Sequence, residues 1–381
     1  MSIFHLNHAS VSSVPRSIFI GGLKLWAERV LCFILPLSTF LCLSTAPHTW
    51  NAALIWTMPV WLCIIADYFS PKDQSIPKPS AMDWWFDARL YVLFALQIAN
   101  IILLLEVTSR LVWSTPLDSA TSAAHIVMFR ILVGTTSCCS GIAIAHELLH
   151  RRARHLRLMG RMLLWTVCYD HFALEHAHGH HRMVGTSADP ATACFGEMFS
   201  DFFRRSVSGQ LRNAWHLETH RLQHRKGMGR LFRNRMLHGL VIEFGLFVLI
   251  FQYYGVIAWL MFVYQAAVAL RMLEAVNYLQ HWGLIRNGSK LAGNCAWDTD
   301  SWFTLHSFIG LSRHADHHTH AGKPYQRLRH VSGCPKLPHG YFYMLMMIRL
   351  GNAKYVEMAS QELIEKNLVH SIVGRHDLAL L

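Results

Sequence analysis

The chain has 381 residues, of which 52% are hydrophobic and 15% are charged, and its formal net charge is +12. Soluble domains carry roughly a quarter charged residues, so this composition excludes an ordinary soluble enzyme and predicts an integral membrane protein. The positive charge comes without a nucleic-acid-binding motif, so we expect no nucleic-acid partner. No linker rich in Gly, Ser or Pro separates the apolar segments, which predicts a single membrane domain over residues 1–381.

Six apolar segments approach the length of about 20 residues that a membrane-spanning helix needs. The sequence therefore predicts an all-α bundle of about six transmembrane helices. The last two are expected to form a hairpin, because Tyr253-Tyr254-Gly255 supplies interfacial aromatic residues followed by a helix break. The predicted spans lie near residues 30–46, 51–69, 90–108, 124–145, 239–254 and 255–276.

The basic residues indicate the orientation of this bundle. All but two of the 35 Lys and Arg precede the first span, separate the second from the third, or lie at 151–235 and from residue 271 onward. The exceptions are Arg110, on the opposite side, and Arg130, inside the fourth span. By the positive-inside rule, both termini and the regions 146–238 and 277–381 are expected on the cytoplasmic side of the plasma membrane, the inner membrane of a bacterium. The basic run at 151–161 predicts contact with anionic membrane lipid.

Nine histidines gather in four short clusters next to these spans. Imidazole is the commonest metal ligand among neutral side chains, and polar residues beside membrane helices are functional candidates by default. The clusters therefore predict a cytoplasmic metal site. They are HELLH (His146 and His150), EHAHGHH (His176, His180 and His181), NYLQHWG (His281) and SRHADHH (His314, His317 and His318).

The spacing within the clusters favours two metals rather than one. In HELLH the two histidines are four apart and share a helical face. In EHAHGHH, His176 and His180 are also expected to share a face, whereas His181 is turned by about 100° from His180. Neighbouring histidines turned apart in this way can serve two different ions, so the pattern predicts a dinuclear site.

Several acidic and histidine side chains adjoin these clusters. Glu147, Glu175 and Asp316 are predicted to support the ligands rather than to act as acids or bases, and Asp316 is well placed to accept a ring N–H. Other histidines are expected at the surface or beside the ligands, namely His171, His178, His216, His220, His224 and His320. Four tryptophans are candidates for lining a substrate path, with interfacial anchoring as the alternative: Trp56, Trp61, Trp84 and Trp85.

Three other interpretations use the same residues. HELLH matches the H-E-x-x-H pattern of zinc proteases, in which the glutamate is a general base, but such a membrane hydrolase needs only one further ligand. Glu-x-x-His at 147–150 and 175–178 matches di-iron carboxylate bundles, which need two more inward glutamates; Glu106 and Glu274 are the candidates. A metal transporter should place its ligands near the bilayer midplane, whereas these clusters lie outside the spans.

Together, the four motifs resemble those of the integral-membrane alkane 1-monooxygenase and xylene monooxygenase family, which is related to membrane fatty-acid desaturases. The resemblance extends over roughly residues 90–345. It implies two non-haem irons, O2, a lipophilic substrate, and electrons from a separate rubredoxin or ferredoxin with its reductase. The implied iron ligands are His146, His150, His176, His180, His181, His281, His314, His317 and His318.

The resemblance favours hydroxylation of a terminal or methyl C–H bond of an alkane or similar substrate. The three-residue gap between His176 and His180, together with His281, differs from the pattern of ordinary desaturases. Desaturation of a lipid or fatty-acyl chain is the alternative, because both reactions begin with the same hydrogen abstraction. One departure is Gln280, which replaces a glutamate that many alkane hydroxylases carry beside the ligand. The nine cysteines include no C-x-x-C pair, so we expect no fused rubredoxin.

Overall fold

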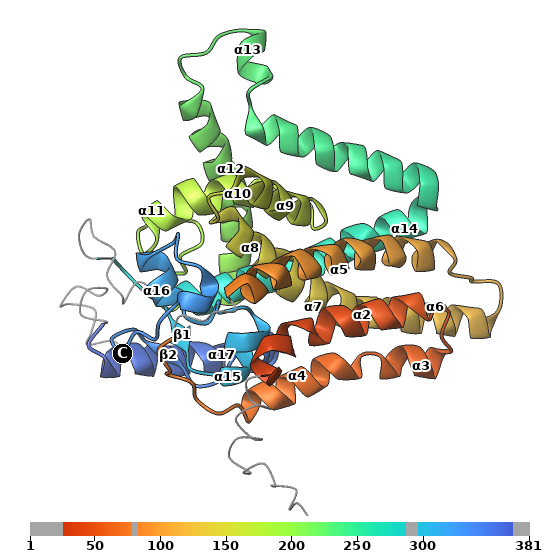
Figure 1. Cartoon of the computed structure of the whole chain (residues 1–381), viewed down its shortest axis with the longest axis horizontal. Coiled ribbons are helices and arrows are strands. Elements are labelled where there is room, and N and C mark those ends of the chain that lie inside the picture. Colours follow the sequence, from red (N-terminus) through yellow and green to blue (C-terminus); the bar gives the residue numbers. More distant parts are fainter. Residues whose placement is uncertain (1–25, 78–82, 287–295, 369–381) are drawn as a thin grey trace, which may run out of the picture.

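The computed structural model describes residues 26–77, 83–286 and 296–368, and these residues are mostly helical (Figure 1). The predicted all-α class is confirmed. Two short strands, β1 (Asp298–Thr299) and β2 (Lys336–Leu337), form one parallel pair beside the helices.

The N-terminal half of the chain is built from long apolar helices, some with tighter or wider turns. In chain order they are η1 (Leu31–Phe33), α2 (Ile34–Ser44), α3 (Trp50–Ile55), α4 (Met58–Tyr68), α5 (Asp83–Ser109), α6 (Pro116–Met128), η2 (Phe129–Val133), α7 (Gly134–Thr136), η3 (Ser137–Ile142) and α8 (Ala143–Leu149).

The remainder alternates short helices with three long ones. These are α9 (Arg154–Trp165), α10 (Phe172–Glu175), η4 (His176–His180), α11 (His181–Met183), α12 (Phe199–Arg221), α13 (Met228–Leu231), α14 (Arg235–His281), α15 (Trp302–Ser307), α16 (His314–Thr319), η5 (Tyr325–Arg327) and α17 (Tyr341–Glu365).

Five helical segments of the described chain are long and apolar enough to cross a membrane: Trp26–Ser44, Trp50–Tyr68, Asp83–Ser109, Pro116–Leu149 and Arg235–His281. The third and fourth are longer than the predicted 90–108 and 124–145, because their helices continue into flanking polar turns. Of the five segments, Pro116–Leu149 is the most buried, because 78% of its most apolar stretch lies inside the protein. It therefore forms the centre of the bundle and carries HELLH at its end.

The last segment, α14, is interrupted at the residue where the sequence predicts a turn. Gly255 has φ 81° and ψ 177°, a conformation that is essentially restricted to glycine. The ring of Phe247 lies 6.1 Å from the rings of both Trp259 and Phe262, whereas residues twelve or more positions apart in a straight helix are separated by roughly 18 Å or more. The chain thus folds back at Gly255 (Figure 1). That its two halves cross the bilayer separately stays a prediction.

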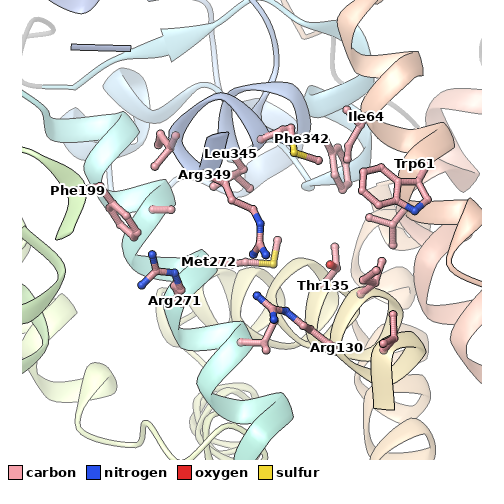
Figure 2. A pocket seen from close by; sticks show the side chains of 17 residues that line it. Trp61, Ile64, Arg130, Thr135, Phe199, Arg271, Met272, Phe342, Leu345 and Arg349 are labelled. Carbon is pink, nitrogen blue, oxygen red and sulfur yellow. The ribbon is translucent and has the colours of Figure 1, made fainter. Parts of the chain in front are cut away.

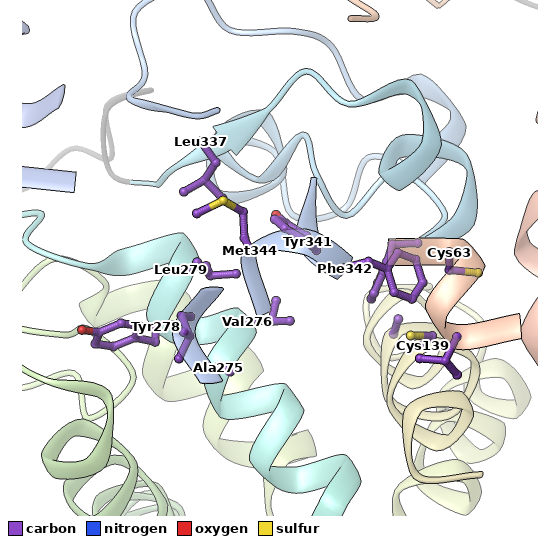
Figure 3. Close-up of a cluster of buried hydrophobic side chains, with 14 of the residues drawn as sticks. Cys63, Cys139, Ala275, Val276, Tyr278, Leu279, Leu337, Tyr341, Phe342 and Met344 are labelled. Atoms are coloured by element: carbon purple, nitrogen blue, oxygen red, sulfur yellow. The ribbon is translucent and has the colours of Figure 1, made fainter. Parts of the chain in front are cut away.

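The main hydrophobic core joins the end of α14 to α17 and to the central helix. Tyr278 and Leu279 of α14 pack in the same buried cluster as Tyr341 and Phe342 of α17, and Cys139 of η3 belongs to it as well (Figure 3). This packing fixes the end of α14, and with it His281, against the helix that carries HELLH. The core therefore brings two histidine clusters distant in sequence to one end of the bundle.

Candidate metal centre

The structure gathers the nine predicted histidines into two groups. In each group, every residue offers a nitrogen within 4.8 Å of the nitrogens offered by the others. Eight of the nine are less than 10% exposed, and His150 is half-buried. The first group is His146, His150, His176, His181 and His317, and the second is His180, His281, His314 and His318.

One local distortion decides how the EHAHGHH cluster is divided. Residues 176–180 form a π-helical turn, in which the repeat is i to i+5 rather than i to i+4. His176 therefore aligns with His181, and their Nε2 atoms are 3.0 Å apart. His176 and His180 do lie on a common face as expected, with stacked rings whose centres are 5.3 Å apart, but they belong to different groups. The expectation that His180 and His181 face different ions agrees with their placement in different groups.

The nitrogen spacing fits a metal ion better than a hydrogen-bond network. Two imidazole nitrogens bound at right angles, each about 2.1 Å from one ion, would be roughly 3 Å apart. Buried Nε2 of His146 has no hydrogen-bond partner among the described residues. The Nε2–Nε2 distances are 3.1 Å for His150–His176, 3.0 Å for His176–His181, 3.2 Å for His181–His317, 3.1 Å for His281–His314 and 3.0 Å for His314–His318.

Burial keeps most of these imidazoles in the neutral form that binds metals. It lowers the pKa of His150 to about 4. Burial and the neighbouring imidazoles hold the pKa of His176 and of His317 well below the usual value. For the same reasons the pKa of His314 and of His318 is also low. These rings are therefore unprotonated at neutral pH and offer lone pairs to an ion.

His180 differs from the other members because a carboxylate holds it. Burial alone would lower its pKa, but the charge and hydrogen bond of Asp189 outweigh burial and raise it. The Nδ1–H of His180 donates to Oδ2 of Asp189 over 2.9 Å, which leaves Nε2 directed at the second group. Asp189 is 1% exposed and lies in the loop after α11. Sequence reasoning missed it, because nothing in a short Asp-Pro loop indicates that its carboxylate folds back onto a histidine.

The three predicted supporting carboxylates have other partners. Glu147 accepts from Nε of Arg151 over 2.8 Å. Glu175 accepts from Nδ2 of Asn213 over 3.1 Å. Asp316 does accept a ring N–H, over 3.0 Å, but the donor is His320, outside both groups. Asp316 also pairs with Lys323, and Arg329 donates its backbone N–H to Asp316. The carboxylates brace the helices that carry the histidines.

The remaining sequence candidates lie away from the two groups. Glu106 is paired with exposed Arg110, and buried Glu274 accepts from Ser206 and Gln210. Neither glutamate is in the histidine groups, so the described residues do not form a di-iron carboxylate site. The other histidines of the sequence analysis are outside the groups as expected: His171 is half-buried, and His178, His216, His220, His224 and His320 are exposed.

A small cavity of about 30 Å³ touches both groups. His146 and His176 of the first group and His314 of the second contribute to its wall, and the rest is mostly apolar. Two amides, Asn277 and Gln280, also line it. Gln280 donates from Nε2 to the hydroxyl of Tyr341 over 2.8 Å, so the amide is held at the wall by α17.

Comparison with known proteins agrees with this site. Residues 121–344 match the family described as fatty acid desaturase. The alkane 1-monooxygenase 2 of Pseudomonas aeruginosa is 31% identical over 335 residues, which cover 86% of this chain and 87% of that protein. The alkane 1-monooxygenase of Acinetobacter baylyi is 34% identical over 227 residues, 57% of this chain and 55% of that protein. The hydroxylase component of the xylene/toluene monooxygenase of Pseudomonas putida is 23% identical over 321 residues, 83% and 84% of the two chains.

These relatives share most of their length with this chain, and the matched region contains all nine grouped histidines. The chain is an oxidoreductase of the monooxygenase type and an integral membrane protein. It therefore belongs to the alkane 1-monooxygenase family, within the wider family of fatty acid desaturases.

Proposed function

We propose that the protein is a non-haem di-iron monooxygenase that hydroxylates a terminal or methyl C–H bond of an alkane or a related lipophilic molecule. The observation that carries the proposal is the division of nine histidines into two groups that both border one small cavity. The names of the relatives supply the reaction type and the substrate class. When bound, a pair of irons would supply the redox chemistry of a monooxygenase, in which two electrons from the donor and two protons allow one atom of O2 to enter a C–H bond while the other leaves as water.

In this proposal each histidine group holds one iron. The first group offers five nitrogens that could hold an ion, and the second group offers four. A donor set made of neutral imidazoles suits iron and also zinc, so the support for iron comes from the family relationship and not from the ligand chemistry. Asp189 holds His180 in the tautomer that leaves Nε2 free to bind an iron in the second group.

The protein also positions the substrate and excludes water. A volume of about 30 Å³ accommodates the end of a chain but little more, so the cavity next to the groups selects a terminal or methyl carbon. Its apolar wall, with Phe172 and Phe308 beside the histidines, keeps water from the reacting carbon. Gln280, which is tied to Tyr341, presents a neutral amide where a glutamate would add a negative charge.

The proposal includes a separate electron donor of the rubredoxin or ferredoxin type, with its reductase. It also places the two iron sites on the cytoplasmic side of the inner membrane, as the basic residues indicate. A soluble donor in the cytoplasm can then reach the end of the bundle where the histidines lie.

Metal content and product identity test the proposal together. Purified protein should contain about two irons per chain. His181→Ala and His318→Ala, one from each group, should each lower the iron content, whereas exposed His216→Ala should keep it. Membranes supplied with a reductase system should convert octane to 1-octanol. One zinc per chain and no iron would contradict the proposal and favour a hydrolase.

The second candidate is a desaturase, and the matching family description favours it. The same membranes should be given octane, xylene and a fatty-acyl substrate in separate reactions. An alkene as the sole product would assign desaturation, whereas an alcohol from octane or xylene assigns hydroxylation. In the zinc hydrolase alternative, Glu147 would be the general base, but its carboxylate is engaged by Arg151 and by the backbone N–H of Tyr325.

A further inference from the structure

A second, much larger cavity of about 390 Å³ lies between α4, the central helix, the C-terminal half of α14 and α17 (Figure 2). Its volume is within the range of roughly 300–1,000 Å³ that is usual for small-molecule sites. Thirteen of its seventeen lining residues are apolar, among them Trp61 and Ile64 of α4 and Phe342 of α17. The cavity can therefore hold a hydrocarbon chain.

Three arginines break this apolar wall. Arg130 comes from the fourth apolar segment, Arg271 from the second half of α14, and Arg349 from α17. No Asp or Glu lines the cavity, and within the described residues none of the three arginines forms an ion pair. All three side chains are exposed and therefore accessible to a ligand, and three arginines without an ion pair beside an apolar wall form a basic site of the kind that attracts acidic head groups. The missing partner is a negative charge that the described chain does not supply.

The arginines are placed to receive one anionic group. Figure 2 shows Arg130 and Arg349 extending from opposite helices toward the same region beside Met272. The guanidinium of Arg271 is held on the neighbouring side, 5.0 Å from the ring centre of Phe199. A guanidinium binds carboxylate or phosphate oxygens through paired hydrogen bonds, and basic pockets between membrane helices are typical sites for acidic head groups.

We propose that this cavity binds an amphiphile with an anionic head, whose oxyanion contacts Arg130, Arg271 and Arg349 and whose acyl chain lies along the apolar wall. Two molecules share this chemistry, a free fatty acid and one chain of an anionic phospholipid. None of the residues lining the large cavity lines the small cavity at the histidines. The proposal therefore does not depend on the assigned reaction.

The test compares binding of matched probes to purified protein in nanodiscs of a zwitterionic lipid. The probes are dodecanoic acid, its methyl ester, and phosphatidylglycerol added to the nanodisc. The variant R130Q/R271Q/R349Q removes the three charges, and R212Q/R225Q/R233Q removes the same number from exposed positions elsewhere. Bound probe is counted by mass spectrometry of the intact complex and of the extracted lipid.

We expect the wild type to bind about one acidic amphiphile per chain, and to bind the acid at least tenfold more tightly than the methyl ester. Each Arg→Gln change should weaken the binding of the acid about tenfold or more, because a hydrogen bond to a charged group is lost. The affinity for the ester should stay unchanged. The exposed triple variant should behave as the wild type. Binding of dodecanoic acid identifies a fatty-acid site, and retention of phosphatidylglycerol alone identifies a phospholipid site.

Equal binding of acid and ester by the wild type, with no retained phosphatidylglycerol, would overturn the proposal. This comparison needs no variant, so it holds even if the triple substitution prevents folding. Single Arg→Lys variants add a milder change: they keep the charge but lose the paired hydrogen bonds, so we expect an intermediate loss of affinity for the acid.

Discussion

At the scale of single residues, the second group of histidines depends on one carboxylate outside the histidine motifs. Asp189 accepts from Nδ1 of His180 and also from the hydroxyl of Thr192, over 2.6 Å, so its own position is fixed. Such partners orient a ligating ring and raise its basicity. By contrast, Asp316 lies within a histidine motif, but its side-chain oxygens accept from Lys323 and His320 and not from any of the nine grouped histidines.

Asp189→Asn should weaken metal retention by about 10- to 100-fold, because His180 loses its charged partner while the loop keeps its shape. Iron remaining after competition with a chelator, measured by elemental analysis, checks this. Asp316→Asn is the matched comparison. It should lower the unfolding temperature and leave the iron affinity close to that of the wild type. An equal loss of iron in both variants would show that Asp189 has no special role in holding His180.

At the scale of elements, departures from the regular α-helix decide the site and the fold. The π-helical turn at 176–180 moves His181 into line with His176, and the break at Gly255 returns the chain to the bundle so that α14 ends at His281. The space around the Cβ position of Gly255 is open, so a side chain there would meet backbone strain rather than a clash.

Gly255→Ala should destabilise the protein by about 1–3 kcal/mol, because alanine is poorly tolerated at this backbone conformation. Gly245→Ala is the matched control in the same element, since Gly245 is helical and also faces open space. It should be neutral or stabilise by up to about 1 kcal/mol. The midpoint of thermal unfolding in detergent measures both. If the Gly255→Ala variant were as stable as Gly245→Ala, residue 255 would not adopt the glycine-specific conformation, and the turn at this position would be contradicted.

The junction of α12 and α14 carries a pH-dependent contribution to stability. Burial alone would raise the pKa of Glu218, but hydrogen bonds from Arg221 and from the backbone N–H of Arg235 lower it below its usual value. A lowered pKa means that the ionised form is favoured in the folded state. The stabilisation is thus present above the unfolded value near 4.3 and is lost as the pH falls through the folded pKa.

Glu218→Gln should therefore cost about 1.5 kcal/mol or more at pH 7, since it removes charged hydrogen bonds. The difference from wild type should shrink as the pH falls below about 4, because the wild-type carboxyl becomes neutral as well. Unfolding midpoints of both proteins across a pH series give this comparison. Exposed Glu357→Gln serves as control and should follow the wild type at every pH.

At the scale of the whole molecule, the orientation in the membrane sets which compartment delivers electrons. Cys194 is the exposed thiol among the described cysteines and lies in the region predicted to be cytoplasmic. Leu117, which is 65% exposed, starts the helix at the other end of the bundle.

A membrane-impermeant maleimide should label Cys194 in inverted inner-membrane vesicles and leave it unlabelled in intact spheroplasts. Leu117→Cys in a Cys194→Ser background should show the reverse pattern. Mass spectrometry of the two labelled peptides identifies the positions. Labelling of both from the same side would reject the proposed topology.

Much of the fold follows from sequence-local physics. Apolar runs long enough to span a bilayer predict helices, because backbone polar groups in lipid must be satisfied within the segment. The break at Gly255 was likewise predictable from its local motif. The sharing of one group by His146 and His150 follows from a spacing of four on a regular helix.

The division into five and four histidines was decided only by the tertiary structure. His146 and His317 meet in one group although 171 positions apart, and the π-helical turn overrides the spacing that EHAHGHH presents. The same holds for Asp189 and for the three arginines of the large cavity, which reach their places from separate elements. Local patterns determine which residues can bind a metal or an anion, whereas the packing of distant helices determines which of them face each other.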